Sequence, residues 1–170
     1  MKVDSIIFFK KKEKSIDQPD HNMDIVDSLN RSLAMVSFDT RGHVLDASEP
    51  FLSLMGYSLD EIKGKHHSLF CSDEIVNTSH YTQFWRDLAA GSKKSGVFPR
   101  YAKGNRQVHI DATYCTIISN GEVQKVVKVA ADVTESHVKQ TLDSELLDAL
   151  NQTFATISFT PDGNILDAND

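Results

Sequence analysis

Cysteine is scarce in this chain of 170 residues, where Cys71 and Cys115 are the only two. Two thiols do not provide the disulfide framework of a small secreted domain. The N-terminal apolar run at residues 6–9 is too short for a signal-peptide core and far too short to cross a bilayer. These absences predict a protein of the reducing cytoplasm that has no membrane span.

The usual catalytic motifs are missing as well. The sequence contains no glycine-rich phosphate loop, no Cys-x-x-Cys pair, no His-Glu-x-x-His helix and no nucleophile elbow. It has 24 acidic against 18 basic residues and a net charge of −6, which argues against nucleic acid as a partner. We therefore expect a protein that is not an enzyme, with no metal site and no nucleic-acid partner.

The chain nearly repeats itself. Residues 148–170 match residues 27–49 without a gap, and ten of the 23 aligned positions are identical. Solenoid repeats have periods of about 20–50 residues, so this longer spacing predicts tandem domains. We expect one whole module followed by the opening of a second, in a fragment of a longer protein.

Apolar residues recur at helical spacing over 24–33, which predicts an amphipathic helix. Two short strands over 34–39 and 43–47 follow, and Gly42 supplies the positive φ that their hairpin needs. The next segments are helical. Gly56, Gly64 and Gly91 end three short helices, of which the second opens with a capping box at Ser58 and the third is capped by Ser79.

From residue 96 onward the apolar period becomes two, which predicts strands over 96–101, 106–118 and 122–134. The chain becomes helical again after the last strand. This order predicts an α+β fold, a five-stranded antiparallel sheet with short helices on one face, flanked by N-terminal and exit helices. The inserted helices should leave a pocket between themselves and the sheet.

Several stretches together resemble the PAS sensor family. They are GKHH at 64–67, FWRDLAAG at 84–91, ATY at 112–114 and the closing DVTE at 132–135. Within the family they are most similar to soluble tandem-PAS chemotaxis receptors of the biofilm-dispersion and aerotaxis types. The resemblance implies a disordered tail or linker over 1–23, a PAS domain over 24–135, a helical linker over 136–153 and the start of a truncated second PAS domain over 154–170.

The resemblance also suggests residues for a cofactor site. His67 matches a family histidine near the pocket mouth, where a neutral imidazole could ligate haem iron; a histidine satisfied by a backbone carbonyl is the alternative. Trp85 lines the pocket or belongs to the helix core. On the predicted strand over 106–118, Ile110, Ala112 and Tyr114 share the inward face.

The cofactor itself stays open, with haem b, FAD or none as the candidates. The arginine-histidine-proline-aspartate stretch by which the aerotaxis receptor holds flavin is absent, because this chain reads FCSD at 70–73. The motif around the reactive cysteine of light-sensing relatives is also absent. Cys71 is therefore expected to be a buried, inert thiol.

The implied function is that of a cytoplasmic sensory module in a bacterial chemotaxis-type transducer. Such a module would sense oxygen, redox state or a small ligand and relay the signal through its flanking helices. We expect a homodimer, paired through those helices and the outer face of the sheet, with a downstream signalling domain in cis. The alternatives are a regulatory front end of a histidine kinase or cyclic-di-nucleotide enzyme, and a ligand-free dimerisation module.

Overall fold

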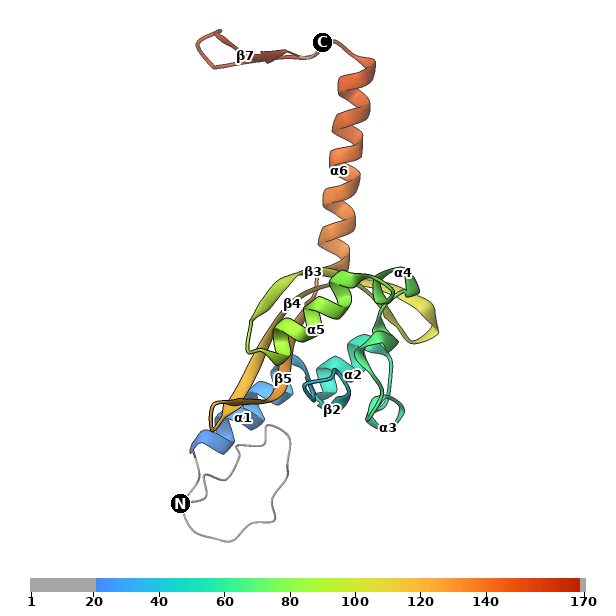
Figure 1. Cartoon of the computed structure of the whole chain (residues 1–170). Coiled ribbons are helices and arrows are strands. Elements are labelled where there is room, and N and C mark those ends of the chain that lie inside the picture. Colours follow the sequence, from blue (N-terminus) through green and yellow to red (C-terminus); the bar gives the residue numbers. More distant parts are fainter. Residues whose placement is uncertain (1–20, 169–170) are drawn as a thin grey trace. The chain divides into compact units, whose positions relative to one another are not determined.

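The structure is a computed structural model that describes residues 21–168 (Figure 1). The chain divides into two compact units, Met1–Val133 and Thr134–Asp170. Most of the predicted tail, residues 1–20, lies outside the described residues. Residues 21–23 were predicted as tail but belong to helix α1, His21–Ser32. The helix was predicted to start at residue 24 because the apolar residues at helical spacing begin at Ile25. Residues 21–23 contain no proline or glycine, so the helix can begin earlier.

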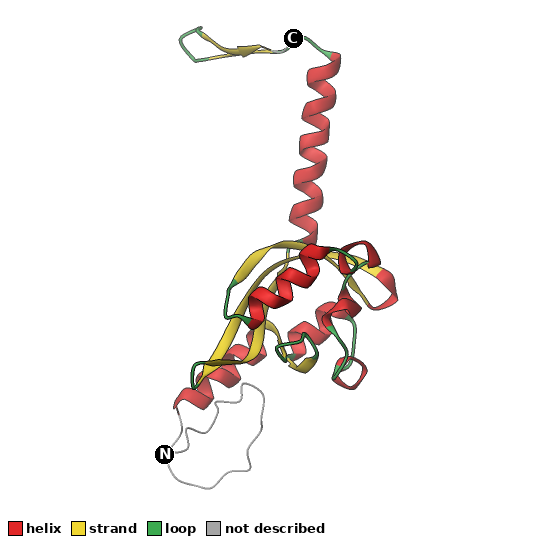
Figure 2. Cartoon of the chain, viewed as in Figure 1, coloured by secondary structure: helices red, strands yellow, loops and turns green. Residues whose placement is uncertain are grey.

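The first unit is built on the predicted five-stranded antiparallel sheet, which the structure confirms (Figure 2). Its strand order is β2-β1-β5-β4-β3. The strands are β1 (Ala34–Phe38), β2 (Val44–Ala47), β3 (Lys94–Ala102), β4 (Arg106–Ser119) and β5 (Glu122–Asp132). Because β1 and β5 pair in the middle, the opening hairpin of the module is joined to its closing strand.

Short helices fill the connection between β2 and β3, and Figure 1 shows α5 lying along the sheet. They are α2 (Glu49–Met55), α3 (Leu59–Ile62), the 3-10 helix η1 (His67–Phe70), α4 (Asp73–Val76) and α5 (Ser79–Ala89). A second 3-10 turn, η2 (Lys103–Asn105), joins β3 to β4. Of these helices, α2, α3, η1 and α5 contribute buried side chains to the core.

Helix ends follow the hydroxyl and glycine signals closely. Gly56 ends α2 in the left-handed conformation, at φ 71°. The N-terminal cap of α5 is Thr78 and not Ser79, which corrects the predicted cap by one residue. Thr78 has extended backbone angles and its hydroxyl accepts a hydrogen bond from the Tyr81 N–H at 3.1 Å. Two adjacent hydroxyl residues are equally good caps by residue type, so backbone geometry selects between them.

The inward face of β4 was predicted correctly. Ile110, Ala112 and Tyr114 are buried, whereas Asp111 and Thr113 are exposed. The alternation places the core between the sheet and the short helices. The largest fully buried side chains of this core are Tyr114, Phe38, Phe51, Phe70, Lys128, Met55, Ile62, Leu88, Ile110 and His67.

The second unit consists of helix α6 (Thr134–Thr153) and a hairpin of β6 (Ile157–Phe159) and β7 (Ile165–Ala168). None of its described residues is buried. Over the described part of the chain, every helix is too short or too polar to cross a membrane.

Candidate functional site

A buried histidine marks the centre of the candidate site. His67 is the first residue of η1, and its backbone N–H donates to the carbonyl oxygen of Gly42 at 2.8 Å. The neighbouring His66 forms a β-bridge with His43. The turn that joins β1 to β2 therefore fixes the start of η1, and the His67 side chain is fully buried.

Both ring nitrogens of His67 contact tyrosine hydroxyls. Nδ1 lies 2.9 Å from Tyr81 Oη on α5, and Nε2 lies 3.1 Å from Tyr114 Oη on β4. A neutral imidazole donates through one nitrogen and accepts through the other, which suits two hydroxyl partners. Burial, together with the positive charges of Arg100 and Lys128, holds the pKa of His67 well below its usual value. The ring is therefore neutral at pH 7.

Two cationic side chains project from the sheet into the same core. Arg100 on β3 is 4% exposed and Lys128 on β5 is 1% exposed. The guanidinium Nη2 of Arg100 donates to Tyr114 Oη at 3.4 Å, and Lys128 Nζ lies 5.3 Å from the centre of the Tyr114 ring. Tyr114 thus touches His67, Arg100 and Lys128. We call these four residues, together with Tyr81, the polar core cluster.

No carboxylate balances these charges, because none of the buried side chains in the described chain is Asp or Glu. The remaining groups that could become anions are Cys71, Tyr81 and Tyr114. Burial raises the pKa of each of them, although the nearby Arg100 opposes the rise. All three are neutral at pH 7, so Arg100 and Lys128 are the groups of the polar core cluster that can carry charge. Burial, together with the charge of Arg100, lowers the pKa of Lys128 to about 7, so its amine is protonated in only part of the molecules at pH 7.

The predicted site residues come together in part. The rings of Trp85 and His67 have centroids 5.4 Å apart, and Tyr114 bonds to His67 directly. Ile110 and Ala112 are buried on the same face of β4 as Tyr114. Whether any of the five holds a cofactor stays a prediction.

Sequence reasoning missed Arg100, Lys128 and Tyr81. A signal for the first two was present. Both occupy inward positions of their strands, and the residues two positions before and after each of them on the same face are apolar. No such signal marks Tyr81, because aromatic residues at helical spacing are ordinary core residues.

A hollow of about 380 Å³ opens beside the cluster. It is lined in part by Cys71, and also by Tyr101 and Ala102, which directly follow Arg100 in β3. The Cys71 sulfur lies 3.7 Å from His67 Nδ1. Cys71 therefore lines the hollow and also contacts the polar core cluster. The other lining residues are Tyr57, Leu69, Ser72, Asp73 and Asn105.

The packed core does not fit a haem or a flavin as it stands. An iron ligated by His67 would have to replace one of its two tyrosine hydroxyls. The rings of Phe38, Trp85 and Tyr114 lie around His67 with centroid separations of 5.4–6.0 Å, so a flat ring system would have to displace them. Among the described residues, no group of three or more His, Cys, Asp or Glu side chains could hold a metal ion.

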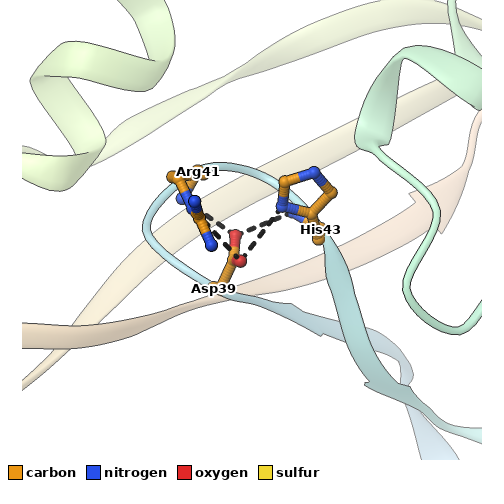
Figure 3. A network of polar contacts seen from close by, with 3 residues as sticks. All are labelled: Asp39, Arg41 and His43. Atoms are coloured by element: carbon orange, nitrogen blue, oxygen red, sulfur yellow. Dashed lines mark hydrogen bonds and ion pairs between the residues drawn. The ribbon is translucent and has the colours of Figure 1, made fainter.

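A second polar network lies at the surface, in the turn between β1 and β2 (Figure 3). Asp39 Oδ1 accepts hydrogen bonds from the backbone N–H groups of Arg41 and His43, both at 2.9 Å. Its Oδ2 lies 3.0 Å from His43 Nδ1. Burial pushes the Asp39 pKa up, but these hydrogen bonds outweigh it and the pKa is lowered. The network stabilises the turn that positions His67.

Comparisons with known proteins agree with this architecture. The family model described as PAS fold matches residues 26–138. A light-oxygen-voltage domain studied with a flavin analogue superimposes with a TM-score of 0.57 and 21% identity, covering 74% of this chain and 96% of that one. This structural likeness concerns the fold alone.

Two curated proteins are similar in sequence. The biofilm dispersion protein BdlA of Pseudomonas aeruginosa is 40% identical over 145 residues, which cover 84% of this chain and 34% of that protein. The aerotaxis receptor of Escherichia coli is 18% identical over 104 residues, which cover 61% of this chain and 20% of the receptor. The chain thus spans about a third or less of the relatives it matches.

Proposed function

The chain belongs to the PAS fold family, and on that premise we propose that it is the cytoplasmic sensory module of a bacterial chemotaxis-type signal transducer. The similarity to a biofilm dispersion protein and to an aerotaxis receptor supports this proposal. The module senses through its core, performs no catalysis of its own, and acts on a downstream signalling domain of the same protein.

The buried polar core cluster is the observation that carries the proposal. Taking one ion out of water costs several kcal/mol unless partners compensate it. A domain that served only as a scaffold would be more stable with apolar residues at these positions. Arg100 and Lys128 are both buried, so the free-energy cost of burying them supports a binding role for the core.

The cofactor question is separate from the sensory role. A light-oxygen-voltage domain of the same fold was studied with a flavin analogue, which makes flavin the first cofactor to test, whereas no relative named above is described as a haem protein. An absorbance spectrum of protein purified from aerobic cells decides it. Twin bands near ~370 and ~450 nm identify flavin, a band near ~400 nm identifies haem, and a featureless spectrum leaves the core free for another ligand.

The relay to the next domain is proposed to run through α6. Val138, Leu142, Leu146 and Leu150 recur every four residues along this helix, and each is between 40% and 60% exposed. A narrow apolar stripe suits pairing with the same helix of a second copy. We therefore propose a parallel homodimer. Inserting Gly-Gly after Gln140 should uncouple sensing from output while ligand binding persists.

Two other functions fit the same fold. One is a regulatory front end of a histidine kinase or cyclic-di-nucleotide enzyme, and the other is a dimerisation module without a ligand. A long heptad-repeat hairpin in the same protein favours the transducer, and a catalytic domain favours the enzyme. A core that binds nothing favours the dimerisation module.

A chimera tests the sensory role directly. This chain replaces the matched segment of the P. aeruginosa biofilm dispersion protein, and dispersion is measured in cells that lack the native protein. We expect the chimera to restore dispersion, and the Gly-Gly insertion after Gln140 to abolish it. A chimera that accumulates to native levels and stays inactive would contradict the proposal.

A further inference from the structure

We infer that the polar core cluster binds a small organic carboxylate, held between the guanidinium of Arg100 and the ammonium of Lys128. This inference names a ligand class for the proposed sensory function and rests on it. It depends on the two buried cations, their unused hydrogen-bonding capacity and the apolar walls around them.

Lys128 provides the first argument. Its ammonium has no hydrogen-bond acceptor among the described residues and lies over two aromatic rings instead, 5.3 Å from the centre of Tyr114 and 5.9 Å from the centre of Phe51. An ammonium can donate three hydrogen bonds. The free donors and the missing counter-charge together mark a place where an anion would be stabilised.

Arg100 provides the second argument. Its Nη1 donates to the carbonyl oxygen of Pro99 at 2.7 Å and its Nη2 donates to Tyr114 Oη at a long 3.4 Å, while Nε has no partner. A guanidinium offers five donors in a planar fork that matches a carboxylate. Within the part of the chain that the structure describes, no acidic side chain takes this place.

The surrounding groups cannot supply the missing anion. His67 is neutral, and the Cys71 thiol and the two tyrosine hydroxyls keep their protons at pH 7 because burial raises their pKa values. His66, at the edge of the cluster, also has a lowered pKa, first because of burial. An anion from outside is therefore the group that completes the charge balance.

The walls favour an organic ligand over a bare inorganic ion. Phe51, Phe70 and Phe98 line the core around the cations and offer nothing to a hydrated ion such as phosphate. The hollow of about 380 Å³ beside Cys71 is at the small end of ligand pockets, which favours a small ligand.

The test is thermal unfolding of the full chain with a panel of probes at millimolar concentration. The probes are sodium acetate, pyruvate, succinate and benzoate, the neutral amides acetamide and benzamide, and inorganic phosphate, all at equal ionic strength. We expect at least one carboxylate to raise Tm by about 4–8 °C, because a ligand that binds only the folded state stabilises it. The amides should have no effect.

Variants assign the effect to the cations. Lys128→Met should raise Tm without ligand by about 5 °C, because it removes an unpaired buried charge, and should abolish the shift with carboxylate. Arg100→Met should also abolish that shift. Lys125→Met is the matched control on the same strand, outside the cluster, and should keep the full response.

Several results would overturn the inference. They are the absence of any carboxylate-dependent shift in the wild type, an equal shift with the amides, a shift with phosphate alone, a shift that survives Lys128→Met, and flavin or haem in the purified protein. The failures of the two proposals are distinguishable. If the chimera restores dispersion but the chain binds no carboxylate, only the proposed ligand class is rejected. If the chain binds a carboxylate but the chimera is inactive, only the proposed sensory role is rejected.

Discussion

The hairpins β1–β2 and β6–β7 have nearly the same sequence and the same register, but different surroundings. In the first, Val36 pairs with Ala47, Ser37 with Asp46 and Phe38 with Val44, with an irregularity after Ser37. In the second, Ile157 pairs with Ala168, Ser158 with Asp167 and Phe159 with Ile165, with the irregularity after Ser158. Local hydrogen bonding is therefore enough to specify this hairpin.

The burial of apolar side chains differs between the two copies. Phe38 is 0% exposed and Phe159 is 56% exposed, although they occupy equivalent positions. The first hairpin pairs with β5 and is covered by short helices, whereas the second forms a two-stranded sheet. Two strands can adopt their native register without a core, but they cannot bury their apolar side chains by themselves. This contrast can be tested residue by residue.

Replacing the equivalent residues Phe38 and Phe159 by alanine should give the largest difference in the free energy of unfolding. Phe38→Ala should lower the free energy of unfolding of the first unit by about 3–5 kcal/mol, because it opens a cavity next to His67 and Trp85. Phe159→Ala should change it by less than about 0.5 kcal/mol. Urea unfolding followed by the fluorescence of Trp85, the single tryptophan of the chain, measures the first unit. Equal losses would mean that the second hairpin is covered in solution.

The free energy of unfolding of the first unit should depend on pH through the buried amine of Lys128. Burial, together with the charge of Arg100, lowers the pKa of Lys128 to about 7 from the ordinary 10.5. Between these values the unfolded chain binds more protons, so the free energy of unfolding should rise by a few kcal/mol as pH increases from 7 to 10.5. The lowered pKa of His67 adds a loss of stability as pH falls below about 6.5.

Unfolding curves at several pH values measure this dependence. Lys128→Met should remove the rise above pH 7. Lys139→Met, on the exposed surface of α6, should leave it in place. A rise that persists in Lys128→Met would assign the titration to another group.

Alanine substitutions at the two equivalent glycines should give a smaller difference in stability than those at the phenylalanines. Gly42 and Gly163 have φ values of +90° and +85°, so alanine costs about 1–2 kcal/mol of backbone strain at either position. A Cβ at Gly42 would also lie 2.8 Å from His66 Nε2 and 2.9 Å from Trp85 Cε2, whereas nothing lies within 4 Å at Gly163.

Gly42→Ala should therefore destabilise the first unit by a further 1–3 kcal/mol or so. Gly163→Ala should leave the Trp85 unfolding transition where it is. The midpoint of urea unfolding checks both. The same midpoint in Gly42→Ala as in the wild type would show that the turn can move away from His66 without cost.

The smallest effect is expected at the turn of Figure 3. Asp39→Ala removes the acceptor of two backbone hydrogen bonds and should cost about 1 kcal/mol. Its equivalent Thr160 accepts one such bond, from Asn164 N–H at 3.1 Å, so Thr160→Ala should not alter the first unit. Because the Asp39 pKa is lowered, its contribution should be lost as pH falls below about 4. If Asp39→Ala lost stability below pH 4 to the same extent as the wild type, this role of Asp39 would be contradicted.

Much of the fold could be predicted because its signals are local. The period of two on β4 separated buried Ile110, Ala112 and Tyr114 from exposed Asp111, and Gly42 marked the hairpin. The start of α1 and the cap of α5 were misplaced, since neighbouring residues there were equally suitable. The polar core cluster could be predicted only in part, because His67, Tyr81, Arg100 and Lys128 come from four separate elements.

The sequence by itself determined the strand alternation, the glycine turns and the register that both hairpins share, because each depends on neighbours within a few residues along the chain. Only the tertiary structure decided which of two equivalent phenylalanines is buried, and that two cations meet around Tyr114 without an anion. Burial and charge balance depend on contacts between distant segments. The same local pattern can therefore be core in one unit and surface in the other.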